Sequence, residues 1–440
     1  MDVEQQILKH LARDARSTVS VIDDYCAMYK DLFKEVRSYE CFKYLHLGII
    51  SPIKKKSLPE IAKVVGIDSA QSLHHFIANS PWSVTKLRKR RLKKILKALK
   101  GNTITLVIDE TGDRKKGKKT DYVARQYLGS VGKVDHGIVS VNAYGIYDNM
   151  TFPLGFKVFK PQGTLKKEDT YKTKNELASE MITELIEFGF QIELVLADSL
   201  YGESSTFIET LDKYQLPYIL AIRSDHGVWM PSNQRVRANR WCKFQRTFSN
   251  QKSETRYIRE IIYGQKRAVT YWEITTDPET MPENSTSFVQ TNIKGKLKKI
   301  LGDLYGLRTW IEYSFRQCKQ ELGWTDYRFT KFKEIEKWWE IIFCVYTMIS
   351  FNSPVFLSLK QSQIPGKQQK VFGSFSAHQQ WDTGNGWKNV LNNFRLIIQP
   401  TILLWLIFPW LDIFPNRYLL LGFHNLIATM NQFQPCYLSV

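Results

Sequence analysis

The sequence predicts a mixed α/β protein in which a sheet carries helices on its faces and helical regions flank the sheet-forming part. Residues 101–225 alternate apolar strand-like runs with amphipathic helical runs. Residues 226–300 break this alternation with a further β-rich stretch, and residues 1–100 and 351–440 have helical patterns. Strands in succession followed by helix–strand–helix–strand are typical of a mixed sheet with helices packed on it.

Charge and cysteine usage narrow the function classes. The 440 residues carry a formal net charge of +19, and clustered positive charge predicts a polyanionic partner, nucleic acid first of all. The six cysteines include no CxxC pair, which argues against a zinc ribbon or a disulfide framework and suits a reducing cytoplasm. The first ten residues are charged and have no apolar core, so we expect no signal peptide.

The most apolar stretch, residues 396–414, is predicted to be buried core of the C-terminal helices. Pro400, Pro409 and Asp412 interrupt it, well short of the ~20 clean apolar residues that a membrane span needs. We therefore expect no membrane association.

The N-terminal region contains a helix-turn-helix-like stretch at residues 57–80. Ser57 can cap a first helix, Gly66 ends it, and Asp68 or Ser69 can cap a second helix. Any two short packed helices give the same pattern, so this signal is weak taken alone.

A strongly basic helix is predicted next, because residues 86–100 contain nine Lys and Arg residues. The Leu and Ile residues at positions 92 to 99 fit one helical stripe and leave a Lys/Arg face. That face is either solvated or in contact with phosphates, and the net charge favours phosphate contact. The residues expected to make it are Arg88, Lys89, Arg90 and Arg91.

The elements of residues 101–225 follow from apolar periodicity and turn residues. Strands are predicted at 103–110, 122–131, 137–149, 151–161, 192–198 and 217–224, and helices at 175–190 and 204–215.

Two aspartates stand at the ends of apolar strands, Asp109 after TLVI and Asp198 after ELVLA. A strand end fixes the backbone of a metal ligand and lets its side chain emerge where the sheet opens. A single such aspartate is more often a helix cap or a turn residue, but two of them are more informative. Phosphoryl transfer needs hard oxygen ligands for two divalent ions ~3.5–4 Å apart. Glu110 is expected on the opposite face of its strand, since side chains alternate.

A basic loop follows the first aspartate. It contains Arg114, Lys115, Lys116, Lys118 and Lys119. We expect this loop to lie where a phosphate backbone passes, although a solvated turn has the same composition.

A third carboxylate is predicted on a helix that begins near residue 300. With Tyr305 at zero on an ideal helical wheel, Arg308 falls near −60°, Glu312 near −20° and Lys319 near −40°. Glu321 falls at about 160°, so it is a poor third ligand. Taken alone, Arg308 and Glu312 are an exposed salt bridge at i,i+4. Beside two strand-end aspartates, we interpret Glu312 as the third metal ligand.

These residues resemble a known family. Tyr305, Arg308, Glu312 and Lys319 match the Y-(2)-R-(3)-E-(6)-K signature of DDE insertion-sequence transposases, and the regions around Asp109 and Asp198 are similar to the first- and second-aspartate regions of that group. The resemblance is closest to the insertion sequence 701-like subgroup of the broader insertion sequence 4-like group, and it covers roughly residues 100–350.

The resemblance implies a ribonuclease H-like catalytic core with a β-rich insertion and a catalytic triad of Asp109, Asp198 and Glu312. Tyr305, Arg308 and Lys319 carry over as DNA contacts. It also implies two Mg²⁺ ions, for which Mn²⁺ can substitute. The expected substrate is double-stranded DNA, both the terminal inverted repeats and the target. A homodimer at the bacterial nucleoid is expected to cut and join this DNA.

Some relatives hold a flipped base with a Trp of the insertion. Trp229, Trp241 and Trp272 are available here, and the sequence selects none of them.

Two other functions stay open from the sequence: an inactive protein that only binds transposon ends, and a ribonuclease H-like nuclease without strand transfer. The expected regions are a basic DNA-binding region (1–100), a catalytic core in two parts (101–225 and 301–350), a β-rich insertion (226–300) and a C-terminal helical region (351–440).

Overall fold

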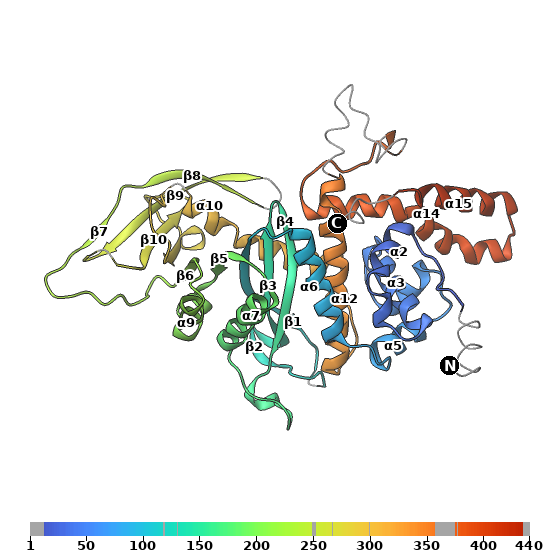
Figure 1. Cartoon of the computed structure of the whole chain (residues 1–440), viewed down its shortest axis with the longest axis horizontal. Coiled ribbons are helices and arrows are strands. Elements are labelled where there is room, and N and C mark those ends of the chain that lie inside the picture. The colour runs from blue at the N-terminus through green and yellow to red at the C-terminus, as the bar shows by residue number, and fades with distance from the viewer. Residues whose placement is uncertain are drawn as a thin grey trace. The chain divides into compact units, whose positions relative to one another are not determined.

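The computed structural model describes residues 13–117, 119–129, 131–248, 252–265, 267–298, 300–356, 375 and 377–433. The chain forms two compact units (Figure 1). Unit 1 combines Met1–Ala98 with Arg316–Val440, and unit 2 is Leu99–Phe315. The helical regions at the two ends of the chain therefore belong to one unit, and the expected region 301–350 is divided between the two.

Unit 2 is built on an 11-stranded mixed sheet. Nine strands follow the order β2-β3-β1-β5-β6-β11-β10-β9-β7. The other two strands lie off this path: β4 pairs with β3, and β8 pairs with β9. The strands are β1 (Ile104–Arg114), β2 (Ala124–Leu128), β3 (Lys133–Tyr147), β4 (Met150–Phe159), β5 (Ile192–Ala197), β6 (Tyr218–Ile222), β7 (Val236–Ala238), β8 (Cys242–Thr247), β9 (Ser253–Tyr263), β10 (Thr270–Thr275) and β11 (Ser287–Thr291). β1 pairs in parallel with β5, and β5 with β6. The remaining pairs are antiparallel.

The strands between residues 226 and 300 continue the main sheet, because β11 pairs with β6. The β-rich character expected for this stretch is therefore present, and its strands share one hydrogen-bonded sheet with those that carry the two aspartates.

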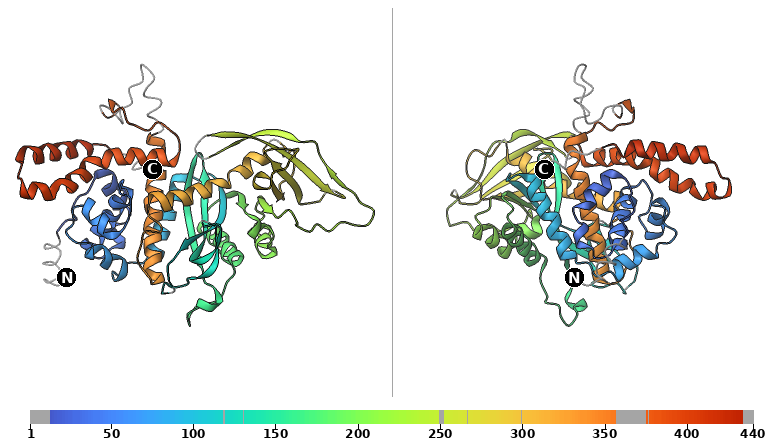
Figure 2. Two further views of the ribbon diagram at one scale, coloured as in Figure 1. Left: turned by 180° about the vertical axis from the view of Figure 1, so that it is seen from behind. Right: turned by 45° about the vertical axis from the view of Figure 1, so that its right-hand side comes forward.

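The helices of unit 2 are α7 (Lys174–Phe188), α8 (Ser199–Gly202), α9 (Ser205–Lys213), α10 (Leu301–Gly306) and α11 (Thr309–Arg316). α7 begins with a capping box between Thr173 and Glu176 and ends at Gly189, whose φ of 105° suits a residue without a Cβ. α7 and α9 lie on one face of the sheet, and the α10–α11 segment lies on the other (Figures 1 and 2).

Unit 1 is helical. Its helices are α2 (Ser20–Ala27), α3 (Val36–Ile50), α4 (Leu58–Val64), α5 (Gln71–Ala78), α6 (Val84–Leu99), α12 (Phe332–Phe351), α14 (Trp387–Ile413) and α15 (Arg417–Met430). α12 supplies much of the core, with Trp338, Ile341 and Phe343 at most 1% exposed. It packs against α3, α5 and α14.

The helix-turn-helix-like stretch contains α4 and α5. Gly66 has a φ of 69° and follows the first helix. Ser57 stands at the N-cap but makes no side-chain capping bond. The second helix begins at Gln71, whose backbone amide donates to the Ser69 hydroxyl over 3.1 Å. The two predicted helices are thus present, with a later start for the second.

Among the described residues, two helical segments have the length and composition to cross a membrane, Phe332–Phe356 and Trp387–Ile413. The apolar window of the first is 89% buried, as in a core helix, whereas that of the second is 28% buried.

The prediction that residues 396–414 are buried core is wrong for the second half of that stretch. Leu403 and Leu406 are 42% and 48% exposed, and Trp410 and Ile413 are each 65% exposed. The stretch is apolar as its composition indicates, but the protein buries only one side of α14.

Candidate active site

Asp109 and Asp198 lie side by side because their strands are parallel neighbours. Ile108 of β1 pairs with Ala197 of β5, and each aspartate is the next residue of its chain. Asp198 also caps the short helix α8, where its Oδ1 accepts a hydrogen bond from the Leu200 amide over 3.0 Å. The structure therefore brings together the two aspartates that the sequence predicted.

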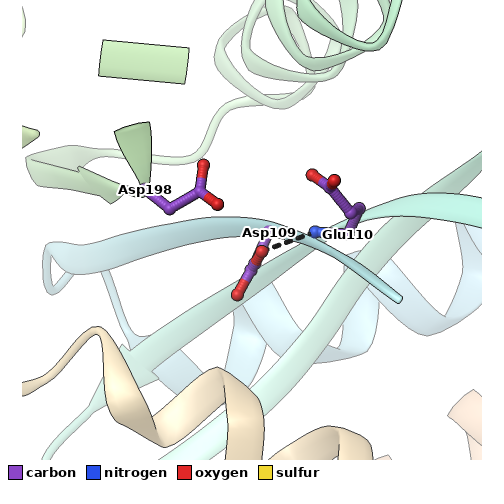
Figure 3. A group of neighbouring side chains, drawn as sticks. All are labelled: Asp109, Glu110 and Asp198. Carbon is purple, nitrogen blue, oxygen red and sulfur yellow. Dashed lines mark hydrogen bonds between the residues drawn. The ribbon is translucent and has the colours of Figure 1, made fainter. Parts of the chain in front are cut away.

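Glu110 joins these aspartates from the other face of β1. Its Oε1 accepts from Lys174 Nζ over 2.8 Å, and its Oε2 accepts from the Tyr201 hydroxyl over 3.1 Å. Figure 3 shows the Glu110 and Asp198 carboxylates above the strand and the Asp109 carboxylate below it. β1 continues to Arg114, so the prediction that Asp109 stands at the end of its strand is wrong. What ends beside Asp109 is the pairing of β1 with β5. Side chains alternate as expected, yet carboxylates from both faces of β1 meet there, and the sequence predicts no role for Glu110.

The backbone around Tyr201 is fixed by a close approach of α8 to β6. A Cβ on Gly202 would lie 1.9 Å from the carbonyl oxygen of Ala221, so only glycine allows this packing. Tyr201 is fully buried, and its hydroxyl is thereby held at Glu110.

Glu312 is connected to Asp109 through Arg308. The Arg308 Nη2 donates to Glu312 Oε1 over 2.9 Å, and Nη1 reaches Asp109 Oδ2 over 3.5 Å. The predicted i,i+4 pair is therefore present, and the same guanidinium also faces the first aspartate. Glu312 itself is half exposed, with 51% of its side chain accessible.

Burial and like charges act on both aspartates. Desolvation raises the pKa of Asp109, Arg308 opposes this shift, and Asp198 and Glu110 add to it. Desolvation and the Glu110 carboxylate likewise raise the pKa of Asp198. Clustered, partly buried carboxylates favour binding of a cation or a proton.

Asp109, Glu110 and Asp198 each offer one carboxylate oxygen, and these oxygens lie within 4.8 Å of one another. Within the part of the chain that the structure describes, they form the one group of this kind. Carboxylate oxygens are the ligands that Mg²⁺ prefers, so the donor set fits a divalent metal site. Glu312 lies outside this group in the present side-chain arrangement.

Tyr305 and Arg308 line an open cavity of about 540 Å³ together with Asp198.

The expected continuous helix is interrupted, since α10 ends at Gly306 and α11 begins at Thr309. Gln317–Glu321 then forms a π-helical turn within unit 1. The wheel position expected for Lys319 assumed an ideal helix, and that assumption is wrong.

Two comparisons with known proteins identify the family of this chain. Residues 29–254 match the family described as DDE superfamily endonuclease. The chain is also 53% identical over 325 residues to a probable transposase for insertion sequence element IS701 of Microchaete diplosiphon, which covers 74% of this chain and 86% of that protein. The chain belongs to the DDE superfamily of endonucleases. Within it, this chain is a DDE transposase similar to that of IS701.

The family match includes Asp109, Glu110 and Asp198 and ends before Glu312. The prediction that Glu312 is the third metal ligand therefore rests on the Y-R-E-K spacing and on the contact to Arg308.

The cations predicted on the basic helix α6 are mostly engaged inside unit 1. Arg91 is fully buried and pairs with Glu340 over 2.8 Å, so its assignment as a DNA contact is wrong. Arg88 pairs with the same carboxylate over 2.8 Å, and Arg90 pairs with Asp31 over 2.7 Å. These partners are far away in the sequence, so no local pattern revealed them.

Of the cations predicted to contact DNA on α6 and after Asp109, four described ones are exposed: Lys89 of α6, Arg114 at the end of β1, and Lys116 and Lys119 of the β1–β2 loop. Among these, Arg114 pairs with Asp135 over 2.8 Å. Lys115 is largely buried and pairs with Asp113 over 2.7 Å. Lys118 lies outside the described residues. The part of the basic loop that faces solvent therefore consists chiefly of Lys116 and Lys119.

The β-rich stretch places one further cation near Tyr305. Arg246 of β8 lies against Gly306, since a Cβ on that glycine would be 3.1 Å from Arg246 Cγ. Burial and the neighbouring Arg256 lower the pKa of Arg246, and Arg308 adds to this effect. No pattern in the sequence predicts that this arginine approaches the site.

The three tryptophans of the same stretch have different environments. Trp272 is 4% exposed and belongs to the core, whereas Trp229 is 79% exposed. The Arg259 guanidinium lies 4.3 Å from the centre of the Trp241 ring. The contacts of Trp272 indicate a structural role.

Proposed function

We propose that this transposase excises and integrates its insertion sequence by cut-and-paste chemistry on double-stranded DNA. The observation that carries the proposal is the pairing of Asp109 and Asp198 on parallel neighbouring strands, with Glu110 and Arg308 beside them. The antiparallel strands β4, β3 and β1 followed by the parallel strands β5 and β6 support a ribonuclease H-like core.

Asp109, Asp198 and Glu312 form the proposed catalytic triad for two Mg²⁺ ions, with Mn²⁺ able to substitute, and Glu110 is a further candidate ligand. When bound, such ions lower the pKa of a water and stabilise the leaving 3′ oxygen. Glu312 needs a change of rotamer to join the acidic group, and its exposed side chain leaves room for one.

The chain's own cations would position the DNA. Arg308 presents a planar guanidinium, which can hold a phosphate through two parallel hydrogen bonds. It now lies between two carboxylates, so neutralising these carboxylates would free it for a phosphate. Tyr305 lines the same cavity as Arg308 and can donate its hydroxyl to the DNA backbone. Lys319, Lys116 and Lys119 are the further phosphate contacts that we propose.

The proposed substrates are the terminal inverted repeats and the target DNA, handled by a homodimer at the nucleoid in the bacterial cytoplasm. Two ends must be cut and joined together, which suits one protomer for each end. The five described cysteines are free thiols, in keeping with a reducing compartment.

The deciding experiment uses a plasmid that carries the element with both ends. With Mg²⁺ the wild-type protein should release the element and join it to a target plasmid, whereas Asp109→Asn should bind the ends without cutting. Equal behaviour of the two proteins would leave only an end-binding function. Cutting without joining of a pre-cut end would identify a nuclease.

A further inference from the structure

The C-terminal helical hairpin of unit 1 exposes an unusual amount of apolar surface. α15 buries none of its 14 residues, although its sequence RYLLLGFHNLIATM is largely apolar. α14 and α15 lie side by side in every view (Figures 1 and 2). The exposed large apolar residues of this hairpin are Leu403, Leu406, Trp410, Ile413, Phe414, Tyr418, Leu419, Leu421 and Leu426.

On α14 these residues have the spacing of a helix–helix seam. Leu403, Leu406, Trp410 and Ile413 follow one another at intervals of three, four and three residues, as the a and d positions of a heptad do. They occupy an arc of about 80° on an ideal helix.

The buried side of α14 lies opposite this seam. Phe394, Ile397, Ile398 and Thr401 are buried and fall roughly 120–220° away from Leu403 on the same wheel. α14 therefore has one seam used inside unit 1 and a second seam that faces outward.

The charge of the hairpin does not suit DNA or a membrane surface. Between positions 396 and 433 the formally charged residues are Asp412 and Arg417, so the surface is nearly neutral in a chain of net charge +19. DNA contacts need Lys and Arg, and helices that lie on membranes are rich in them. α15, with 14 residues, is shorter than the ~20 residues of a span. α14 has the length of a span, but Pro400, Pro409 and Asp412 interrupt its apolar run.

The exposed area matches what a stable dimer buries. Trp410, Phe414 and Tyr418 are 65%, 67% and 88% exposed, which corresponds to roughly 450 Å² of aromatic surface. The six exposed Leu and Ile residues add on the order of 300 Å². A standard interface buries about 800 Å² on each partner, so this hairpin alone supplies nearly the whole of one side.

We propose that the α14–α15 hairpin binds the same hairpin of a second copy of this chain, so that the transposase is a dimer before it meets DNA. When an apolar surface binds the same surface of a second copy, the pair has twofold symmetry and no seam stays exposed. Two helical hairpins joined in this way form a four-helix bundle. Trp410 and Tyr418 are the residue types that dominate binding energy at interfaces.

The inference gives a surface to the homodimer proposed above, and it is tested without DNA or metal, so its failure would leave the catalytic proposal untouched. Sedimentation equilibrium of the full-length protein over a wide concentration range should give twice the chain mass of 51.5 kDa. The double substitution Leu406→Glu/Trp410→Glu should raise the dissociation constant of the dimer about 30-fold or more.

Trp229→Glu is the matched control, because it removes an equally exposed tryptophan, 79% accessible, from unit 2. It should leave the mass unchanged. Both substituted side chains are exposed, so the double variant should fold like the wild type. Far-UV circular dichroism checks this. A wild-type protein that stays monomeric would overturn the inference. So would a dimer that the double variant retains, or a monomer that floats with phosphatidylcholine vesicles.

Discussion

The buried Tyr201 hydroxyl donates a hydrogen bond to the Glu110 carboxylate over 3.1 Å. Glu110 thereby has a fixed orientation toward Asp198, and Lys174 balances its charge from the start of α7. Such outer contacts orient metal ligands and are nearly as important as the ligands themselves.

Tyr201→Phe removes this bond and leaves the ring in place. We expect the affinity for Mg²⁺ to fall about tenfold and the free energy of unfolding to fall by about 1–2 kcal/mol. Isothermal titration and thermal melts measure the two effects. Tyr218→Phe is the control, since Tyr218 is also buried, 1% exposed, on the neighbouring strand β6. An unchanged Mg²⁺ affinity in Tyr201→Phe would show that Glu110 needs no such support.

Glu110→Gln and Glu312→Gln should differ in what they lose. Because Glu110 lies in the acidic group of the metal-free protein, its substitution should weaken Mg²⁺ binding about 10–100-fold before any DNA is added. Glu312 lies outside that group, so its substitution should abolish cleavage while DNA binding stays largely intact. Metal titration without DNA and a gel-shift assay separate the two. Loss of DNA binding in Glu312→Gln would identify a structural residue instead.

Asp109→Asn should stabilise the metal-free protein at neutral pH by about 1–2 kcal/mol. The pKa of Asp109 is raised in the folded state, so the folded protein holds this proton more strongly than the unfolded chain. Stability from this group is present below about pH 4 and is lost as pH rises through the raised pKa. Melting curves in chelator at acidic and at neutral pH should converge for wild type and variant at the acidic end. Added Mg²⁺ should stabilise only the wild type.

Arg308→Lys should retain DNA binding better than Arg308→Ala, but both should cut slowly. A lysine carries the charge without the planar fork that reaches Asp109 and Glu312 together. Loss of one preorganised donor typically costs about 10²–10³-fold in rate. Single-turnover cleavage at saturating DNA measures this. A fully active Arg308→Ala protein would remove the arginine from the mechanism.

Lys319→Ala and the double variant Lys116→Ala/Lys119→Ala should weaken DNA binding and reduce its salt dependence. Each lost phosphate contact lowers the slope of log affinity against log salt by about 0.9. Lys213→Ala, an exposed lysine on α9, is the control and should leave the slope unchanged. Binding curves at several salt concentrations provide the test, and an unaltered slope would remove the substituted lysines from the list of contacts.

The strands and both aspartates could be predicted because the decisive signals are local. Apolar runs located β1 and β5, and an aspartate follows each run. The end of β1 was not predicted, because the strand continues through Gly112 and Asp113 to Arg114. Their pairing in space follows from parallel neighbouring strands, which the alternation of strands and helices already indicated.

The basic helix α6 could be interpreted only in part from its own residues, since its exposed lysines form the predicted basic face whereas its arginines do not belong to it. Nine basic positions describe a cationic face, but Arg88 and Arg91 both pair with Glu340, which lies about 250 positions later in the chain. A buried ion pair of this kind depends on how distant helices meet. The role of Glu110 could not be predicted for a related reason. Strand alternation predicts the face on which a side chain lies, but not which residues approach that face.

The helix around Glu312 shows the limit of an ideal wheel. Tyr305, Arg308 and Glu312 remain near one another, since short helical pieces keep their spacing. The break after Gly306 and the π-helical turn at Gln317–Glu321 change the rotation per residue. No residue pattern in the sequence predicts the helix break or the π-helical turn.

Because unit 1 is built from both ends of the chain, the ribosome delivers its two halves at different times. Unit 2 is complete while α12 and α14 are still to be synthesised, and α3 has no α12 to pack against until then. A nascent chain therefore carries finished catalytic strands and an unfinished helical unit. A prematurely terminated product would keep the acidic residues yet lack the second half of unit 1.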